Sequence, residues 1–462
     1  MYQYDEIVLK KVPQPRIDHP EHPVPLRDET IAERMEKVRS RMIHAGLDCL
    51  IVYADLEHGS NFEYLVGFLP RFEEALLVLH SDGRAYLVLG NENLNKASKA
   101  RIPCIPVHAP YFSLPNQPME NTGSFTDILR KTDIEGKKTG LVGWKLFTSK
   151  YEDNTRLFDL PHYITEAVFT LCGRENVTNT CDIFIGRDGA RNTNNPNEIA
   201  HYEFGASLAG DCMLDAMNAL KPGISEMETA DRLNRYGQRN SVVTIAAFGE
   251  RFIKANMYPT GRKLQTGDTV SLTVGYKGGL SSRAGYAVKG PEELPAEIRA
   301  YTDVLVKPYF TAIRAMLEKI HTGMTGSELY ALINKVLPRN TYNWKLNPGH
   351  LTADEEWSMS PVYENSDTVL SPGMLFQTDI IPGLPGYGGV SAESTFALAD
   401  ASLQERIRQE YPDLWQRFEE RRLYIRETLG IQLSDEVLPM CSTLAYLRPY
   451  LLCDEAMTVT QK

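Results

Sequence analysis

Residues 220–233 read LKPGISEMETADRL, and residues 320–333 read IHTGMTGSELYALI. Both stretches have an apolar residue, two further positions, a glycine, a second apolar residue and then Ser225 or Thr325. A helical stretch that carries Glu228 or Glu328 follows in each case. The same local structure is therefore expected twice along the chain.

The repeat continues on the C-terminal side of both stretches. GDTVSLTVGY from Gly267 matches GMLFQTDIIP from Gly373, and GGLSSRAGYAV from Gly278 matches GGVSAESTFAL from Gly388. Chance similarity of glycine-bounded strands is the alternative, and three matches in the same order disfavour it. Two copies are too few for a solenoid, so the repeat predicts two α+β halves related by a pseudo-two-fold axis over a shared sheet. A functional site is expected where the halves meet.

The region before the repeat predicts a separate domain. Apolar residues at helical spacing over 28–44 indicate a helix, DCLIVYA indicates a buried strand, and ALLVLHSDGRAYLVLG indicates a hairpin. The polar stretch IGRDGARNTNNPNEIA then separates this region from the repeat. We expect an α/β domain over 1–183 and an α+β domain over 184–462, with a helical C-terminal extension from about residue 403.

Composition excludes several classes of protein. A chain of 462 residues allows two to four domains, and its formal net charge of -11, without a dense basic run, argues against nucleic acid as a partner. No apolar run approaches the ~18 residues of a membrane span. The seven cysteines show no paired spacing, which is typical of reduced thiols, so a cytoplasmic location is expected.

Aligning the two halves places Thr273 opposite Asp379 and Arg283 opposite Glu393. The halves resemble the pita-bread fold of prolidase, aminopeptidase P, methionine aminopeptidase and creatinase. The resemblance covers about residues 185–400, and the N-terminal region is similar to the smaller domain of that family. It implies a site in which peptidases bind two metal ions, with one carboxylate from each of the four aligned places and a histidine from a Gly-His motif, here Gly349-His350.

Two of those places do not carry an acid in this chain. Thr273 and Arg283 stand where the first two carboxylates are implied, and a two-ion site needs several anionic oxygens. We expect the Arg283 guanidinium to face Asp379 and Glu393 and to supply positive charge itself, in a pocket without metal or other cofactor. The alternatives are that Arg283 points to solvent, or that it forms a purely structural salt bridge with the two carboxylates.

The remaining residues form an acid/base set. Asp379 and Glu393 are expected close enough for one pKa to be raised, so that one carboxylate activates water while His350 donates a proton or steadies an oxyanion. The predicted catalytic residues are Glu393, Asp379, His350 and Arg283, and the predicted substrate-binding residues are Asn256, Tyr258, Thr273, Arg262 and Arg71, the last acting across a dimer interface.

The first functional hypothesis is a cytoplasmic, homodimeric, metal-independent hydrolase of the creatinase and prolidase type. It would cleave a C–N bond in a small amidino, amide or dipeptide-like substrate, so its partners would be a small molecule or short peptide and a second copy of the chain, with no nucleic acid and no membrane. The second hypothesis is a non-catalytic pita-bread protein that binds a small ligand or peptide. The third is a metal-dependent Xaa-Pro aminopeptidase or dipeptidase.

Overall fold

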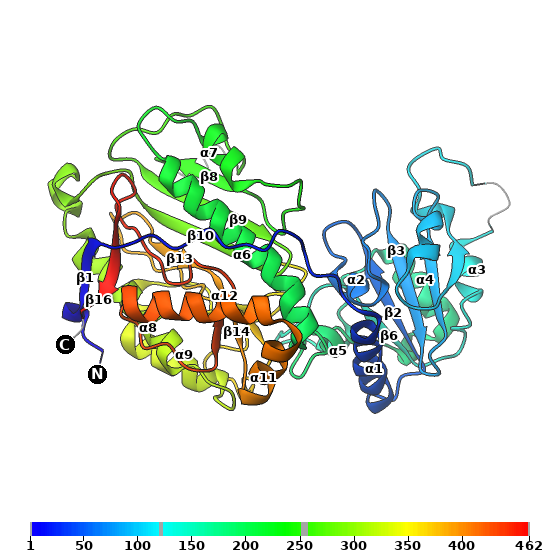
Figure 1. The fold of residues 1–462 in the computed structure, drawn as a ribbon. Helices are drawn as coiled ribbons and strands as arrows, with labels where there is room; N and C mark the ends of the chain where they lie inside the picture. The colour runs from blue at the N-terminus through cyan, green and yellow to red at the C-terminus, as the bar shows by residue number, and fades with distance from the viewer. Residues whose placement is uncertain (1, 120–122, 251–256, 461–462) are drawn as a thin grey trace. The chain divides into compact units, whose positions relative to one another are not determined.

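The computed structural model describes residues 2–119, 123–250 and 257–460, and the chain divides into two compact units (Figure 1). The smaller unit is Leu26–Asn192, and the larger unit combines Met1–Pro25 with Thr193–Lys462. The expected boundary between 183 and 184 lies close to the observed one. The expected first domain over 1–183 is nevertheless wrong at its start, because β1 (Ile7–Lys11) pairs antiparallel with β16 (Glu455–Val459) and so belongs to the larger unit.

A six-stranded mixed sheet with helices on both faces forms the smaller unit. Its strand order is β5-β4-β3-β2-β6-β7, with β2, β3 and β4 antiparallel and the outer pairs parallel. Alternate residues of the central strands enter two separate cores, one with α1, α2 and α5 and the other with α3 and α4. The elements are α1 (Asp28–His44), β2 (Cys49–Ala54), α2 (Ser60–Val66), β3 (Ala75–His80), β4 (Ala85–Leu89), β5 (Ile105–His108), α3 (Phe125–Arg130), β6 (Thr139–Val142), α4 (His162–Cys172), β7 (Val177–Asn179) and α5 (Asp182–Ile185).

The expected local structure of this unit is confirmed. The helix predicted over 28–44 is α1, the strand predicted at DCLIVYA is β2, and the predicted hairpin is the β3–β4 pair, whose turn contains Gly83 at a φ of 93°. A mixed sheet between two helical layers is the α/β arrangement that the sequence predicts.

Two four-stranded sheets organise the larger unit. Their strand orders are β13-β10-β9-β8 and β11-β12-β14-β15. The strand elements are β8 (Ile245–Phe248), β9 (Thr269–Tyr276), β10 (Gly279–Tyr286), β11 (His350–Leu351), β12 (Leu375–Gln377), β13 (Ser391–Glu393), β14 (Thr395–Leu398) and β15 (Val437–Pro439). One continuous segment, residues 391–398, joins the sheets, because β13 pairs with β10 and β14 pairs with β12.

The helices show the internal repeat directly. A long helix, a short loop and a second helix occur as α6 (Pro196–Ala219) with α7 (Glu226–Leu233), and again as α8 (Lys307–Lys319) with α9 (Gly326–Val336). The second helix of each pair starts with a capping box, Ser225 with Glu228 and Thr325 with Glu328. The similarity found in the sequence is therefore a similarity of structure, and α6 packs on the β9–β10 hairpin (Figure 1).

Close packing of that hairpin on α6 requires glycine in its turn. Gly278 has a φ of 103°, and a Cβ there would lie 2.1 Å from the Tyr202 carbonyl oxygen. A side chain at this position would push the hairpin away from the helix.

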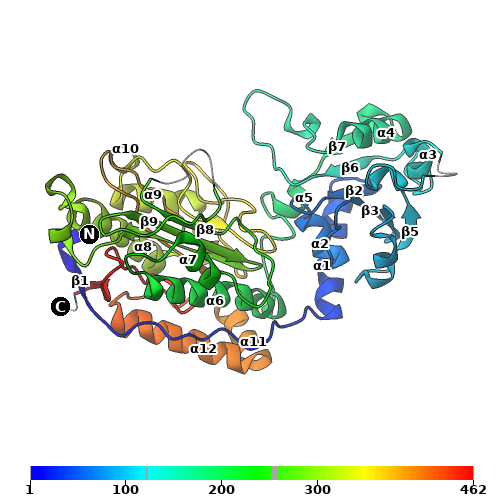
Figure 2. The same cartoon turned by 90° about the horizontal axis from the view of Figure 1, so that it is seen from above.

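The C-terminal extension forms two helices, α11 (Ala401–Glu410) and α12 (Pro412–Leu423), because Pro412 cannot continue the first one. The N-terminal segment runs along α12 (Figure 2), where Arg421 donates two hydrogen bonds to Asp18 at 2.7 and 2.8 Å. Arg421 also donates to Glu203 of α6 at 2.7 Å, and Arg417 pairs with the same carboxylate. These ion pairs, in which Arg421 and Glu203 are buried, hold the N-terminal segment and the extension against α6.

No helix within the described ranges is both long and apolar enough to cross a membrane.

Candidate functional site

His350 is the first residue of β11, and its side chain is buried. Gly349 before it has a φ of 83°, and a Cβ there would approach the Gln377 carbonyl oxygen to 3.1 Å. The Gly349 N–H donates to the Asp379 carbonyl at 2.7 Å. Glycine is therefore required at this turn, and the turn holds His350 beside the residues that follow β12.

The orientation of the imidazole leaves one nitrogen without a partner. Its Nδ1 lies 3.3 Å from the Leu351 carbonyl oxygen, which can only accept, so Nδ1 carries the proton and Nε2 presents a lone pair. Nε2 is 3.6 Å from Glu393 Oε1 and 3.8 Å from Asp379 Oδ2, too far for hydrogen bonds. Buried Nε2 has no hydrogen-bond partner among the described residues, which costs about 1–3 kcal/mol.

The two predicted carboxylates converge on this nitrogen. Glu393 ends β13, Asp379 follows β12, and both side chains are buried. Burial, together with the Glu356 carboxylate, raises the pKa of Glu393 to about 8, and Arg283 opposes the shift. Burial and the charge of Glu393 raise the pKa of Asp379 well above its usual range, while burial lowers the pKa of His350. The three groups thus favour their neutral forms when nothing cationic lies between them.

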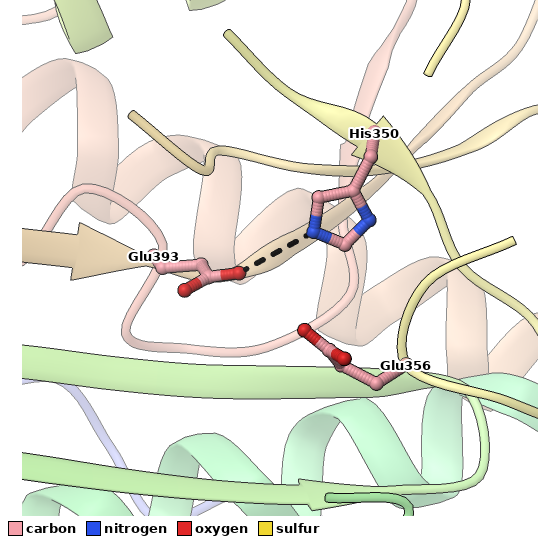
Figure 3. A group of neighbouring side chains, drawn as sticks. All are labelled: His350, Glu356 and Glu393. Atoms are coloured by element: carbon pink, nitrogen blue, oxygen red, sulfur yellow. Dashed lines mark ion pairs between the residues drawn. The ribbon is translucent and has the colours of Figure 1, made fainter. Parts of the chain in front are cut away.

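A third carboxylate, Glu356, completes the group and was not predicted from the sequence. His350, Glu356 and Glu393 each offer one donor atom, and the three atoms lie within 4.8 Å of one another (Figure 3). Burial raises the pKa of Glu356, and the Trp357 ring lies 5.6 Å from the His350 ring. The only sequence signal was the acidic run Asp354-Glu355-Glu356 shortly after the Gly-His motif, which shows no periodicity or motif spacing.

Hydroxyl side chains stand at the two positions where the resemblance implies the first two metal-binding carboxylates. Thr273 on β9 pairs with Ser282 on β10, and Ser282 pairs with Glu393 on β13, so these three residues share one row across the sheet. The Thr273 and Ser282 hydroxyl oxygens are 3.0 Å apart and hydrogen-bond to each other. Ser282, not Arg283, therefore occupies the second place.

The role predicted for Arg283 is not the one the structure shows. Arg283 lies one residue along β10 from Ser282 and points to the opposite face, where it is 1% exposed. It donates to the carbonyls of Tyr446, Thr443, Ser282 and Glu393 and to the Ser394 hydroxyl at 2.6–3.1 Å. These bonds use all five of its N–H groups, so Arg283 holds strands together and acts on the Glu393 carboxylate only through its charge.

The structure shows no contact of the other predicted residues with the histidine and carboxylates among the residues that it describes. Tyr258 is 69% exposed, and Arg262 donates to Asp268 at 3.2 Å. Arg71 belongs to the smaller unit, where its backbone N–H donates to Asn93 and its guanidinium lies over the Phe72 ring. Asn256 lies outside the described residues.

The donor set does not fit two metal ions in the manner that the resemblance implies. Such a site uses four carboxylates and a histidine, and two of those places here carry the neutral Thr273–Ser282 pair. The chain keeps His350, Asp379 and Glu393 and adds Glu356 from outside the four places. A buried imidazole nitrogen facing carboxylates is the donor chemistry of a single borderline or hard cation.

A protein-family model matches part of the larger unit. Residues 201–400 match the model of Metallopeptidase family M24, a range that contains His350, Glu356, Asp379 and Glu393. The uncharacterized peptidase YqhT of Bacillus subtilis (strain 168) is 28% identical over 215 residues, which cover 44% of this chain and 58% of that protein. The chain therefore matches less than two thirds of the length of this curated relative.

Solved structures share the fold of both units. The Xaa-Pro dipeptidase from Bacillus anthracis has a TM-score of 0.59 at 20% identity, and the match covers 80% of this chain and 96% of that one. The prolidase from Pyrococcus horikoshii OT3 has a TM-score of 0.61 at 18% identity, with 79% and 95% covered. The predicted fold class, an α/β N-terminal domain followed by an α+β pita-bread domain, is confirmed.

Proposed function

We propose, from the membership of this chain in the family of creatinase, prolidase and aminopeptidase P, that it is a peptidase-like hydrolase. The reaction would be hydrolysis of a C–N bond in a small amide or dipeptide-like substrate. The observation that carries the proposal is the buried group of His350, Asp379 and Glu393, with Nε2 of the imidazole 3.6 and 3.8 Å from the two carboxylates.

These groups can perform the proton transfers of amide hydrolysis. A carboxyl group with a pKa of about 8, as for Glu393, is close to the ideal for exchanging protons near neutral pH. In its ionised form, the Glu393 carboxylate would accept a proton from the attacking water and return it to the leaving nitrogen as the C–N bond breaks. Nε2 of His350 faces the same space and can accept a hydrogen bond from the water or from the substrate N–H, which orients the reacting groups.

The test is a screen for hydrolysis. Xaa-Pro dipeptides come first, because two similar structures are named as a prolidase and an Xaa-Pro dipeptidase; other dipeptides and guanidino compounds follow. Glu393→Gln should lower kcat by at least about 100-fold, since general acid–base groups contribute about 10²–10⁴-fold. Exposed Glu364→Gln is the matched control. Equal rates for the two variants would refute the assignment of the site.

A second candidate function is supported by the Thr273–Ser282 pair. Both positions where the resemblance implies an acid carry a hydroxyl, and the two hydroxyls hydrogen-bond to each other. This pair favours a non-catalytic protein that uses the site to bind a small ligand. Absence of turnover across the screen, together with a rise in melting temperature caused by one of the compounds, would favour this function over hydrolysis.

Metal independence, the homodimer and the cytoplasmic location remain predictions from the sequence. Metal dependence fits the site at least as well, because His350, Glu356 and Glu393 lie within 4.8 Å of one another. Measuring the hydrolysis rate after chelation and again after addition of divalent ions distinguishes metal-independent from metal-dependent hydrolysis. Light scattering during gel filtration measures the oligomeric state.

A further inference from the structure

We propose that this chain binds one divalent cation through His350, Glu356 and Glu393, and that Glu356 substitutes for the carboxylates absent at Thr273 and Ser282. The proposal concerns the same site as the proposed function and takes only the location of the site from it. It departs from the two-ion arrangement that the resemblance implies, because Glu356 lies at none of the four places where that arrangement takes its carboxylates.

The His350 side chain supplies evidence for a ligand that is independent of the acidic residues. It is 1% exposed, its Nδ1 is directed to the Leu351 carbonyl, and its Nε2 is aimed at Glu393 and Asp379 without a hydrogen bond among the described residues. The lone pair on Nε2 faces two carboxyl groups, and this arrangement is electrostatically unfavourable when the carboxyl groups are ionised. A cation between them would accept the lone pair and neutralise the carboxylates together, and the backbone bond at Nδ1 is the usual support of a metal-bound histidine.

The segment that carries Glu356 is built to hold it in place. Asp354 forms an ion pair with Lys277 at 3.2 Å, and the Gly278 N–H donates to the Ala353 carbonyl at 2.7 Å. The Thr352 hydroxyl donates to the Glu355 carbonyl at 3.0 Å, which closes a tight turn just before Glu356. Anchored at the β9–β10 turn, this segment directs the Glu356 carboxylate toward His350 and Glu393 (Figure 3).

The distances fit a single ion. Ligand atoms about 2.0–2.2 Å from one ion lie between about 3 and 4.4 Å from each other, and the three donor atoms here lie within 4.8 Å of one another. Small side-chain rotations would bring them to those distances. Asp379, 3.8 Å from Nε2, is near enough to serve as a fourth ligand. One imidazole with carboxylates suits Mn²⁺, Fe²⁺, Co²⁺ or Zn²⁺.

Within residues 2–119, 123–250 and 257–460, a second ion lacks ligands of its own. The row Glu393–Ser282–Thr273 offers one anionic group, and the two hydroxyls are occupied by their mutual hydrogen bond at 3.0 Å. Neutral hydroxyls on this row cannot offset the charge of a second divalent ion beside the first. The number of bound ions therefore distinguishes this site from the two-ion arrangement.

The experiment measures metal binding by the full chain in the absence of substrate. Protein freed of metal by chelation is dialysed against Co²⁺, Mn²⁺ or Zn²⁺, and bound metal is counted by mass spectrometry. We expect one ion per chain, with Glu356→Gln lowering the affinity for that ion by at least about tenfold, since even residues that only support a ligand contribute 10–100-fold. Glu355→Gln, which removes the same charge from the adjacent residue, is the matched control and should keep the wild-type affinity.

Trp357 provides a second readout in the wild-type chain. Its ring lies 5.6 Å from the His350 ring, so Co²⁺ at the site should quench its fluorescence, and Trp357→Phe should lose that part of the quenching. Two ions per chain, no ion at millimolar metal, equal affinities for the Glu356→Gln and Glu355→Gln variants, or quenching unchanged by Trp357→Phe would each overturn the proposal. Since none of these measurements uses substrate, loss of the hydrolase hypothesis would leave them unaffected.

Discussion

Replacing Glu393 by glutamine should stabilise the metal-free protein. Burial raises the pKa of this carboxyl from 4.5 to about 8, so above pH 4.5 the unfolded chain releases a proton that the folded chain keeps. Stability therefore falls as pH rises from 4.5 to 8. Linkage gives a cost of about 1 kcal/mol at pH 5 and about 3 kcal/mol at pH 7, and a neutral glutamine removes it.

The assay is thermal unfolding in the presence of a chelator at pH 5, 6 and 7. For the larger unit, of about 300 residues, an unfolding entropy of about 2 cal/mol/K per residue converts 3 kcal/mol into a rise of about 5 °C at pH 7. At pH 5 the rise should shrink to about 1–2 °C. Glu364→Gln, at an exposed carboxylate, should leave the melting temperature unchanged at every pH. A Glu393→Gln protein that melts lower than wild type at pH 7, or a shift that does not depend on pH, would refute the reasoning.

Three further predictions concern how the larger unit is held together. Arg283→Lys should destabilise the chain by about 2–3 kcal/mol in urea unfolding, because lysine has three N–H donors where Arg283 donates five hydrogen bonds. The metal affinity of this variant should change far less than that of Glu356→Gln. Arg421→Met should cost about 3–5 kcal/mol, because the buried Glu203 carboxylate is left with Arg417 alone and Asp18 loses both hydrogen bonds from the guanidinium, and limited proteolysis should then cut the N-terminal segment faster. Gly349→Ala should cost about 1–2 kcal/mol, since alanine at a φ of 83° is strained, and should weaken metal binding; wild-type affinity would contradict the role of this turn.

The repeat and the positions of His350, Asp379 and Glu393 could be predicted because they rest on local patterns. Glycine-bounded strands and capped helices keep their spacing within each copy, so aligning the copies singles out Asp379 and Glu393, and both carboxylates face His350 in the structure. The residue of β10 that lies opposite Glu393 could not be predicted in the same way. The β9–β10 turn sets which residue of β10 faces the site, and a shift of one residue exchanges Ser282 for Arg283 and reverses the face.

The positions of Glu356 and of the N-terminal segment could not be predicted for a different reason, which is that both depend on contacts between distant parts of the sequence. The segment that carries Glu356 is held by the ion pair of Asp354 with Lys277 and by the hydrogen bond from Gly278 to Ala353, which are contacts between residues far apart in the sequence. Residues 1–25 belong to the larger unit because β1 pairs with β16 and Asp18 pairs with Arg421. No periodicity announces such contacts, since they depend on the whole fold being formed.

The row Glu393–Ser282–Thr273 has a consequence for protein engineering. Among the described residues, every ionisable donor of the site lies in the second copy of the repeat, which begins at Ile320, and the β9–β10 hairpin of the first copy contributes two hydroxyls. Acids can therefore be introduced at Thr273 and Ser282 without removing any existing ligand. The double variant Thr273→Asp/Ser282→Asp would add the two carboxylates that the resemblance implies, and the number of ions it binds would show whether this hairpin decides between one ion and two.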